Sequence, residues 1–222
     1  MSEPSTSNQH ETSAAVLLCV AAGFADAIGF VHLGVFAANM TGNTVLLALS
    51  LAQLDGAALL TRGATLAAFF AGAALGRLML RVSGGRVGPG LVVEAALLAG
   101  SAFIDPKSVL SLWTIAAAMG IQASTIVKFN GAAVSTVVIT STMARLAEWL
   151  SDRLASLGPS TARAPGTPPS LLLNTWLAYA AGALLAALAM PRLPLPLLLP
   201  AVLVLVVAWL YTARPRAVAG AA

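Results

Sequence analysis

The fold is indicated most clearly by residues 13–54, which read SAAVLLCVAAGFADAIGFVHLGVFAANMTGNTVLLALSLAQL. Asp26 is the only aspartate, glutamate, lysine or arginine in this run. A helix that crosses a membrane needs about 20 consecutive apolar residues, so the run contains two candidate membrane segments, residues 13–33 and 35–54. We therefore expect a helical protein embedded in a lipid bilayer.

The composition of the whole chain predicts the same class. Apolar residues make up 59% of its 222 residues, charged residues make up 9%, and the mean hydropathy is +0.89. A soluble domain has about 25% charged residues, so this chain has too few polar side chains to cover a soluble globule. Its 12 Lys and Arg residues are scattered, whereas nucleic acids are bound by a concentrated basic surface. We expect the lipid bilayer as a partner and no nucleic acid.

Eight apolar stretches follow one another along the chain. They are residues 13–33, 35–54, 58–80, 89–104, 108–127, 132–150, 171–190 and 194–212. Residues 151–170 interrupt this series with Pro, Ser, Thr and Arg, a composition typical of a flexible exposed loop. The expected organisation is an all-α polytopic membrane protein with a single membrane domain over residues 1–222.

A weak internal repeat divides the eight stretches into two halves, about 13–104 and 108–212. Three pairs of similar segments carry the repeat: residues 23–34 with 120–131, 40–44 with 139–142, and 68–72 with 178–182. The first pair begins and ends with glycines 97 positions apart, and the second places threonines 99 positions apart. Because transporters are often built from duplicated halves, we expect two related halves here.

The distribution of Lys and Arg tests how many stretches cross, because cytoplasmic loops collect positive charge. If all eight crossed, the two sides of the membrane would carry seven and five of these residues. If 35–54 and 132–150 each enter and leave on one side, the division becomes nine to three, with both termini cytoplasmic. A variant in which 35–54 also spans gives the same nine to three. We expect about six full crossings plus two broken or re-entrant segments, in halves inverted relative to each other, with seven or eight spans left open.

Several short motifs resemble the YoaK family of bacterial inner-membrane proteins. They are Asp26 with Phe30, Met40-Thr41-Gly42-Asn43-Thr44, and Met119-Gly120-Ile121-Gln122 followed by Thr140. The resemblance extends from Ala14 to Leu210, and the Met-Thr-Gly-Asn motif is its most specific part. Family members usually have Gln-Asn-Ala and Thr-Gly-Thr where this chain has Gln-Ala-Ser at 122–124 and Thr-Ser-Thr at 140–142. The resemblance implies a bacterial inner (cytoplasmic) membrane protein and no particular activity.

Asp26 is the first candidate for a functional residue. It lies past the middle of the first apolar stretch, where a charged group costs about 2.5–3.5 kcal/mol on insertion scales. Such a carboxyl group is protonated, paired, or in contact with a water-filled cavity. Two interpretations are open: a proton or cation relay, or a hydrogen bond that joins helices. We favour the relay.

A polar motif follows the first apolar stretch. Four amide or hydroxyl side chains lie close together there: Asn39, Thr41, Asn43 and Thr44. In one interpretation Asn43 or Thr41 caps a helix that begins at Val45. In the other the motif binds a solute or ion, since interrupted helices at matching positions of two halves mark transporter sites. We expect Thr140 and Thr142 to line the matching half and to face this motif.

Other polar and small residues within the apolar stretches have simpler interpretations. Gln122 is a further binding candidate, although a buried amide more often joins two helices by a hydrogen bond. Glu94 follows Gly90 by four residues in the short fourth stretch, so we expect it near a membrane interface. Gly72 and Gly76 have the spacing of closely packed membrane helices.

Motifs of several enzyme classes are missing. The chain has no HExxH zinc motif, no GxSxG nucleophile turn and no GxxxxGK[ST] phosphate loop, so we expect no enzymatic activity, cofactor or metal. Cys19 is the only cysteine, which excludes an intrachain disulfide and a Cys-rich metal site. We expect a secondary transporter or permease for a small solute or ion, coupled to protons or cations. The alternative is a non-transporting membrane scaffold or assembly partner, and both functions are compatible with a homo-oligomer.

Overall fold

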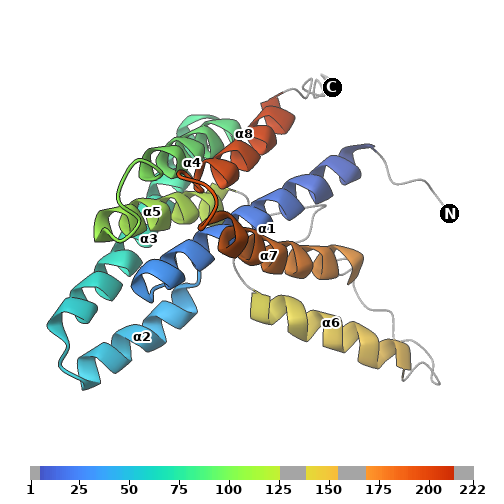
Figure 1. The fold of residues 1–222 in the computed structure, drawn as a ribbon. Coiled ribbons are helices and arrows are strands. Elements are labelled where there is room, and N and C mark those ends of the chain that lie inside the picture. Colours follow the sequence, from blue (N-terminus) through green and yellow to red (C-terminus); the bar gives the residue numbers. More distant parts are fainter. Residues whose placement is uncertain (1–5, 126–138, 155–168, 213–222) are drawn as a thin grey trace.

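The computed structural model describes residues 6–125, 139–154 and 169–212, and every regular element in these ranges is a helix (Figure 1). The helices are α1 (Thr6–Leu33), α2 (Met40–Ala52), α3 (Gly56–Val82), α4 (Gly88–Ser101), α5 (Val109–Thr125), α6 (Ile139–Leu154), α7 (Pro169–Ala189) and α8 (Leu198–Thr212). Each apolar stretch therefore corresponds to one helix, and the prediction of an all-α protein is confirmed.

Several of the described helices suit a bilayer. Three are long and apolar enough to cross it: Thr12–Leu33 within α1, Gly56–Val82 (α3) and Pro169–Ala189 (α7). α2, α4, α5 and α8 are shorter apolar helices of 10–17 residues. At about 1.5 Å per residue a helix of 17 residues is about 26 Å long, close to the hydrocarbon thickness of about 30 Å. The polytopic membrane class is confirmed, and the number of crossings stays a prediction.

α6 differs from the other helices because it is strongly charged. Its residues include Arg145, Glu148, Asp152 and Arg153, too many charges for a helix surrounded by lipid. The prediction of an apolar stretch over 132–150 is therefore wrong for its second part, where apolar and charged positions alternate in an amphipathic helix. The first part, up to residue 138, lies outside the described ranges.

Helix packing relates the two halves of the chain. The most extensive contacts join α1 to α7 and α3 to α5, and smaller ones join α4 to α5, α1 to α8, α2 to α3 and α6 to α7. Exchanging α1–α4 with α5–α8 converts each of these pairs into another pair of the set. The contact between α4 and α8 is unchanged by the exchange, and only the minor contact of α3 with α4 lacks a counterpart in the described part of the chain.

Two glycines set the close approach of α1 and α7. A Cβ atom added to Gly23 would overlap the carbonyl group of Tyr179, with 2.8 Å to its carbon. One added to Gly182 would lie 2.8 Å from the carbonyl carbon of Val20. Any larger residue at either position would push the two backbones apart, so the sequence requires glycine on both helices.

α3 and α5 approach each other in the same way. A Cβ atom at Gly72 would lie 2.7 Å from the carbonyl carbon of Ala117, and one at Gly120 would lie 3.0 Å from that of Phe69. Ala117 and Gly120 of α5 come 97 positions after Val20 and Gly23 of α1. Phe69 and Gly72 of α3 come 110 positions before Tyr179 and Gly182 of α7. The close packing expected at Gly72 is confirmed.

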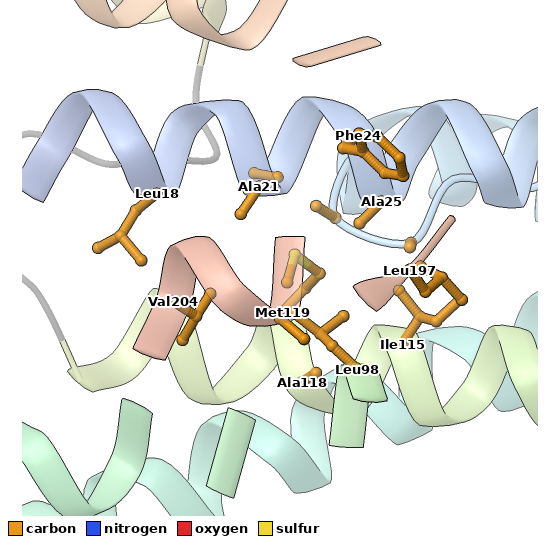
Figure 2. Packing of buried hydrophobic residues seen from close by; sticks show 14 of the residues in the cluster. Leu18, Ala21, Phe24, Ala25, Leu98, Ile115, Ala118, Met119, Leu197 and Val204 are labelled. Carbon is orange, nitrogen blue, oxygen red and sulfur yellow. The ribbon is translucent and has the colours of Figure 1, made fainter. Parts of the chain in front are cut away.

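α1 is the central helix of the bundle. In its apolar window 67% of the residues are buried, against 17% in α3 and 33% in α7. Figure 2 shows the side of α1 that carries Leu18, Ala21 and Ala25 facing side chains of α5 and α8, such as Met119 and Val204. The outer surface of α3 instead exposes large apolar side chains: Leu60, Phe70, Leu75, Leu78 and Val82. Such a surface is suited to lipid and unsuited to water.

Candidate functional site

The helical structure is interrupted between α1 and α2, where Val35, Ala37 and Ala38 are buried. α1 ends at Leu33, and Gly34 has the left-handed conformation (φ +64°) that commonly ends a helix. The following residues fold back along α1: a Cβ atom at Gly29 would lie 2.6 Å from the carbonyl oxygen of Val35. α2 then begins at Met40 and packs against α3 (Figure 1).

Asp26 holds the returning chain against α1. Its side chain is 3% exposed, and its Oδ1 accepts hydrogen bonds from the backbone amides of Ala38 (2.5 Å) and Asn39 (3.1 Å). The hydroxyl group of Tyr179 in α7 donates a hydrogen bond to Oδ2. One carboxyl group thus joins α1, the α1–α2 connection and α7. These bonds fit the structural interpretation of Asp26, and the relay interpretation stays a prediction.

Asn39 caps the N-terminus of α2. Its Oδ1 accepts a hydrogen bond of 3.1 Å from a backbone amide in the first turn. The prediction that Thr41 or Asn43 caps a helix starting at Val45 is therefore wrong, because the helix already begins at Met40 and its cap precedes it.

The rest of the polar motif lies within the first turn of α2. Asn43 is fully buried, and its side-chain amide makes two hydrogen bonds with the backbone of Phe36: Nδ2 donates to the carbonyl oxygen (2.6 Å), and Oδ1 accepts from the amide (2.9 Å). Thr44 donates its hydroxyl hydrogen to the carbonyl oxygen of Met40 (2.8 Å). Thr41 and Thr44 are exposed. The motif therefore has a buried amide that fixes the loop and two hydroxyl groups on its surface.

The structure does not bring the two threonine motifs together. α2 packs against α3 and α6 against α7, and α2 does not contact α6 within the described ranges. Thr142 is buried on α6, whereas the side chain of Thr140, also on α6, lies outside the described part. The expectation that the motifs face each other is wrong because each lies at the start of a helix that packs on the third helix of its own half.

Only one of the two glycine contacts carries a carboxyl–hydroxyl pair. Asp26 and Tyr179 form it between α1 and α7. At the same spacing in α5 and α3 stand Ala123 and Phe69, which have no polar side-chain group. The candidate site at the α1–α2 break therefore belongs to the first half of the chain.

Arg62 makes a polar link that the sequence did not reveal. It lies in α3, and its Nη1 donates hydrogen bonds to the carbonyl oxygen of Leu46 (2.8 Å) and to the hydroxyl group of Ser50, both in α2. Ser50 is fully buried. A lone arginine within an apolar stretch is the signal that points to such a partner.

Two more polar side chains lie in the interior, on α4 and α5. Glu94 is 0% exposed, and its expected place near a membrane interface stays a prediction. Its burial reflects the close approach of α4 to α5 at Gly90, where an added Cβ atom would lie 2.9 Å from the Oγ1 of Thr125. Gln122 is also fully buried, and its Nε2 donates a hydrogen bond to the carbonyl oxygen of Leu18 in α1 (3.2 Å). This bond joins two helices, as expected for a buried amide.

Comparison with known proteins identifies the family. The model of a family described as a protein of unknown function (DUF1275) matches residues 14–210. The chain belongs to this family. It is also 34% identical over 151 residues to the UPF0700 transmembrane protein YoaK of Bacillus subtilis (strain 168), a match that covers 62% of this chain and 66% of that relative.

The match to YoaK spans just under two thirds of that protein's length. It confirms the resemblance seen in the motifs and, with the apolar helices, a membrane protein. No solved structure matches the chain.

Proposed function

We propose that this member of the DUF1275 family is a secondary transporter or permease for a small solute in the cytoplasmic membrane of a bacterium. The break between α1 and α2 carries the proposal. Interrupted membrane helices form transporter sites because their free backbone groups can contact a solute, and irregular backbone is tolerated in a membrane only inside protein or beside a water-filled cavity. Here the break adjoins the carboxyl group of Asp26, and Thr41 exposes a hydroxyl group at the start of α2.

The proposal includes two related halves that are inverted in the membrane. Support comes from the contacting helix pairs, because exchanging α1–α4 with α5–α8 converts one pair into another, such as α1–α7 into α3–α5. The glycine contacts of α1 with α7 and of α3 with α5 add to this support, because they recur at constant spacings along the chain. A duplicated unit of three crossings would place the halves in opposite orientations, as in many secondary transporters.

A non-transporting scaffold or assembly partner is the competing function. One observation favours it: Asp26, Asn39 and Asn43 all make hydrogen bonds to the backbone of their own chain. A scaffold would require only that these groups stabilise the fold.

Flux measurements separate the two functions. Uptake and efflux profiles of cells with and without the protein, followed by the purified protein in liposomes, should give a solute whose flux saturates with concentration. Asp26→Asn should abolish coupled flux. The matched control is Asp55→Asn. Asp55 is an exposed N-cap of α3 whose Oδ1 accepts a hydrogen bond from the amide of Ala58 (3.0 Å), and asparagine caps equally well. Normal expression without saturable flux for any solute would favour the scaffold.

A further inference from the structure

Glu94 lies in the interior, and no described residue compensates its charge. The side chain is 0% exposed, and neither carboxyl oxygen has a hydrogen-bond partner among the described residues. α4 packs against α3, α5 and α8 (Figure 1). α5 has no ionisable side chain, α8 has Tyr211, and α3 has Arg62, Arg77 and Arg81.

None of the three arginines of α3 is available to Glu94. Arg62 donates its hydrogen bonds to α2, and Arg77 and Arg81 are exposed. An ionised carboxylate with no hydrogen bond and no opposite charge is very costly in an apolar interior. Among the described residues nothing compensates a charge on Glu94, which favours the neutral, protonated form of its carboxyl group.

A purely structural role does not account for a glutamate at this position. Asp26 shows how a buried carboxyl group stabilises the fold here, by accepting hydrogen bonds from two backbone amides and a hydroxyl group. Glu94 makes no such bond within the described ranges. Leucine or glutamine would fill the same volume without an ionisable group, so the property specific to Glu94 is its ability to gain and lose a proton.

The Thr125 hydroxyl group, a second buried polar group, lies between Glu94 and the N-terminal end of α4. Glu94 is six residues after Gly88, the first residue of α4, about 9 Å along the helix axis. Gly90 lies between them and faces the hydroxyl group of Thr125, which is 4% exposed and has no hydrogen-bond partner in the described part. Residues four apart share one face of a helix, so Gly90 and Glu94 both face α5.

The site suits a proton better than a metal ion. Hard cations take about six or more oxygen ligands, and the described residues contain no group of three or more His, Cys, Asp or Glu side chains that could hold a metal. A proton needs one carboxyl group. We propose that Glu94 is a proton-binding site within the membrane domain, with the hydroxyl group of Thr125 between it and the N-terminal end of α4.

If the protein is the transporter proposed above, this proton is the coupling ion. That role rests on the proposed function, whereas proton binding itself can be measured without any solute. The full-length protein is reconstituted in liposomes, and its protonated carboxyl band is followed by infrared spectroscopy as the pH changes. We expect a band that titrates with pH and is absent from Glu94→Gln.

Chemical labelling gives a second measurement. Dicyclohexylcarbodiimide adds to protonated carboxyl groups in apolar surroundings, and mass spectrometry locates the adduct. Labelling of Glu94 should fall about tenfold for each pH unit above the midpoint, as for a single proton, and sodium ions should not protect it. Exposed Asp55 and Asp105 serve as unlabelled controls in the same sample.

Variants of two buried threonines test the hydroxyl group. Thr125→Val should keep the thermal stability of the wild type, since the hydroxyl group has no partner to lose, and should slow proton exchange at Glu94 severalfold. Thr175→Val is the matched control, because the Thr175 hydroxyl group bonds to the carbonyl oxygen of Leu171 (2.9 Å). Thr175→Val should be less stable than the wild type and should leave proton exchange at Glu94 unchanged.

Three results would overturn the proposal. The first is a Glu94 carboxyl group that keeps one protonation state at every pH in both measurements. The second is protection by sodium at constant pH, which would assign the site to a cation. The third is a Thr125→Val variant whose proton exchange at Glu94 matches the wild type, which would exclude Thr125 from the proposed site. A Glu94 that titrates in a protein without solute flux would refute only the transport function.

Discussion

Replacing Asp26 with alanine tests whether this side chain holds the α1–α2 break together. The change leaves three donors without an acceptor: the amides of Ala38 and Asn39 and the hydroxyl group of Tyr179. Each unsatisfied buried donor costs about 1–3 kcal/mol. The sum is about 3–9 kcal/mol, and because the tyrosine hydroxyl can rotate toward another acceptor we expect about 3–6 kcal/mol. That is a large fraction of a total stability of about 5–15 kcal/mol.

Asp26→Asn is the matched variant. The amide oxygen still accepts the hydrogen bonds of Ala38 and Asn39, and its NH₂ group can donate to the hydroxyl oxygen of Tyr179. Only the additional strength of charge-assisted hydrogen bonds is lost. We expect a loss of about 1–2 kcal/mol.

The assay is reversible unfolding of the purified protein in detergent, followed by circular dichroism. Tyr179→Phe is added to form a double-mutant cycle with Asp26→Asn, which measures the coupling of the pair. An alanine variant that unfolds at the same denaturant concentration as the asparagine variant would refute the reasoning, because the amides of Ala38 and Asn39 would then not depend on Asp26. Lost flux in an Asp26→Asn protein of nearly normal stability would instead support the relay.

Three further predictions concern packing, an interhelical bond and topology. Gly23→Ala should destabilise the protein by about 1–3 kcal/mol or more. Gly100→Ala should stabilise it by about 0.5–1 kcal/mol, because nothing lies within 4 Å of the added atom. Thermal unfolding compares the two variants, and equal effects would contradict the close helix contact. Arg62→Met should cost about 1–3 kcal/mol by leaving a buried serine hydroxyl group without its donor, and an unchanged midpoint in the same assay would show that the bond contributes nothing. Reporter fusions after Gly84 and Pro165 should indicate the cytoplasm, and a fusion after Asp105 should indicate the periplasm. One location for all three would rule out the topology.

The sequence predicts the helices well because apolar composition and helix length are local properties. The start of α2 is different. It is set by the cap at Asn39 and by the hydrogen bonds of Asp26, one of which comes from Tyr179, 153 positions away. Such a distant partner leaves no local pattern, so the residues of the break could be predicted but not their bonds.

Glu94 illustrates the second limit. Its complete burial did not follow from its place in a short apolar stretch, because that burial depends on how closely α5 and α8 approach α4. That approach is decided by glycines such as Gly90, which act through residues on another helix. The Arg62 bond to α2 was missed for the same reason, since the acceptors are a backbone carbonyl and one serine.

The long separation between Asp26 and Tyr179 has a consequence for biogenesis. The chain is synthesised from its N-terminus at about 5–20 residues per second, so the 153 positions between the two residues correspond to about 8–30 s. During this interval α1 is already made and can bond to the α1–α2 connection, but its glycine surface has no α7 to cover it. α3 meets α5 much sooner, because Phe69 and Gly120 are closer in sequence. The α3–α5 pair can therefore form before the α1–α7 pair. Until α7 is made, the glycine surface of α1 depends on lipid or an insertion factor.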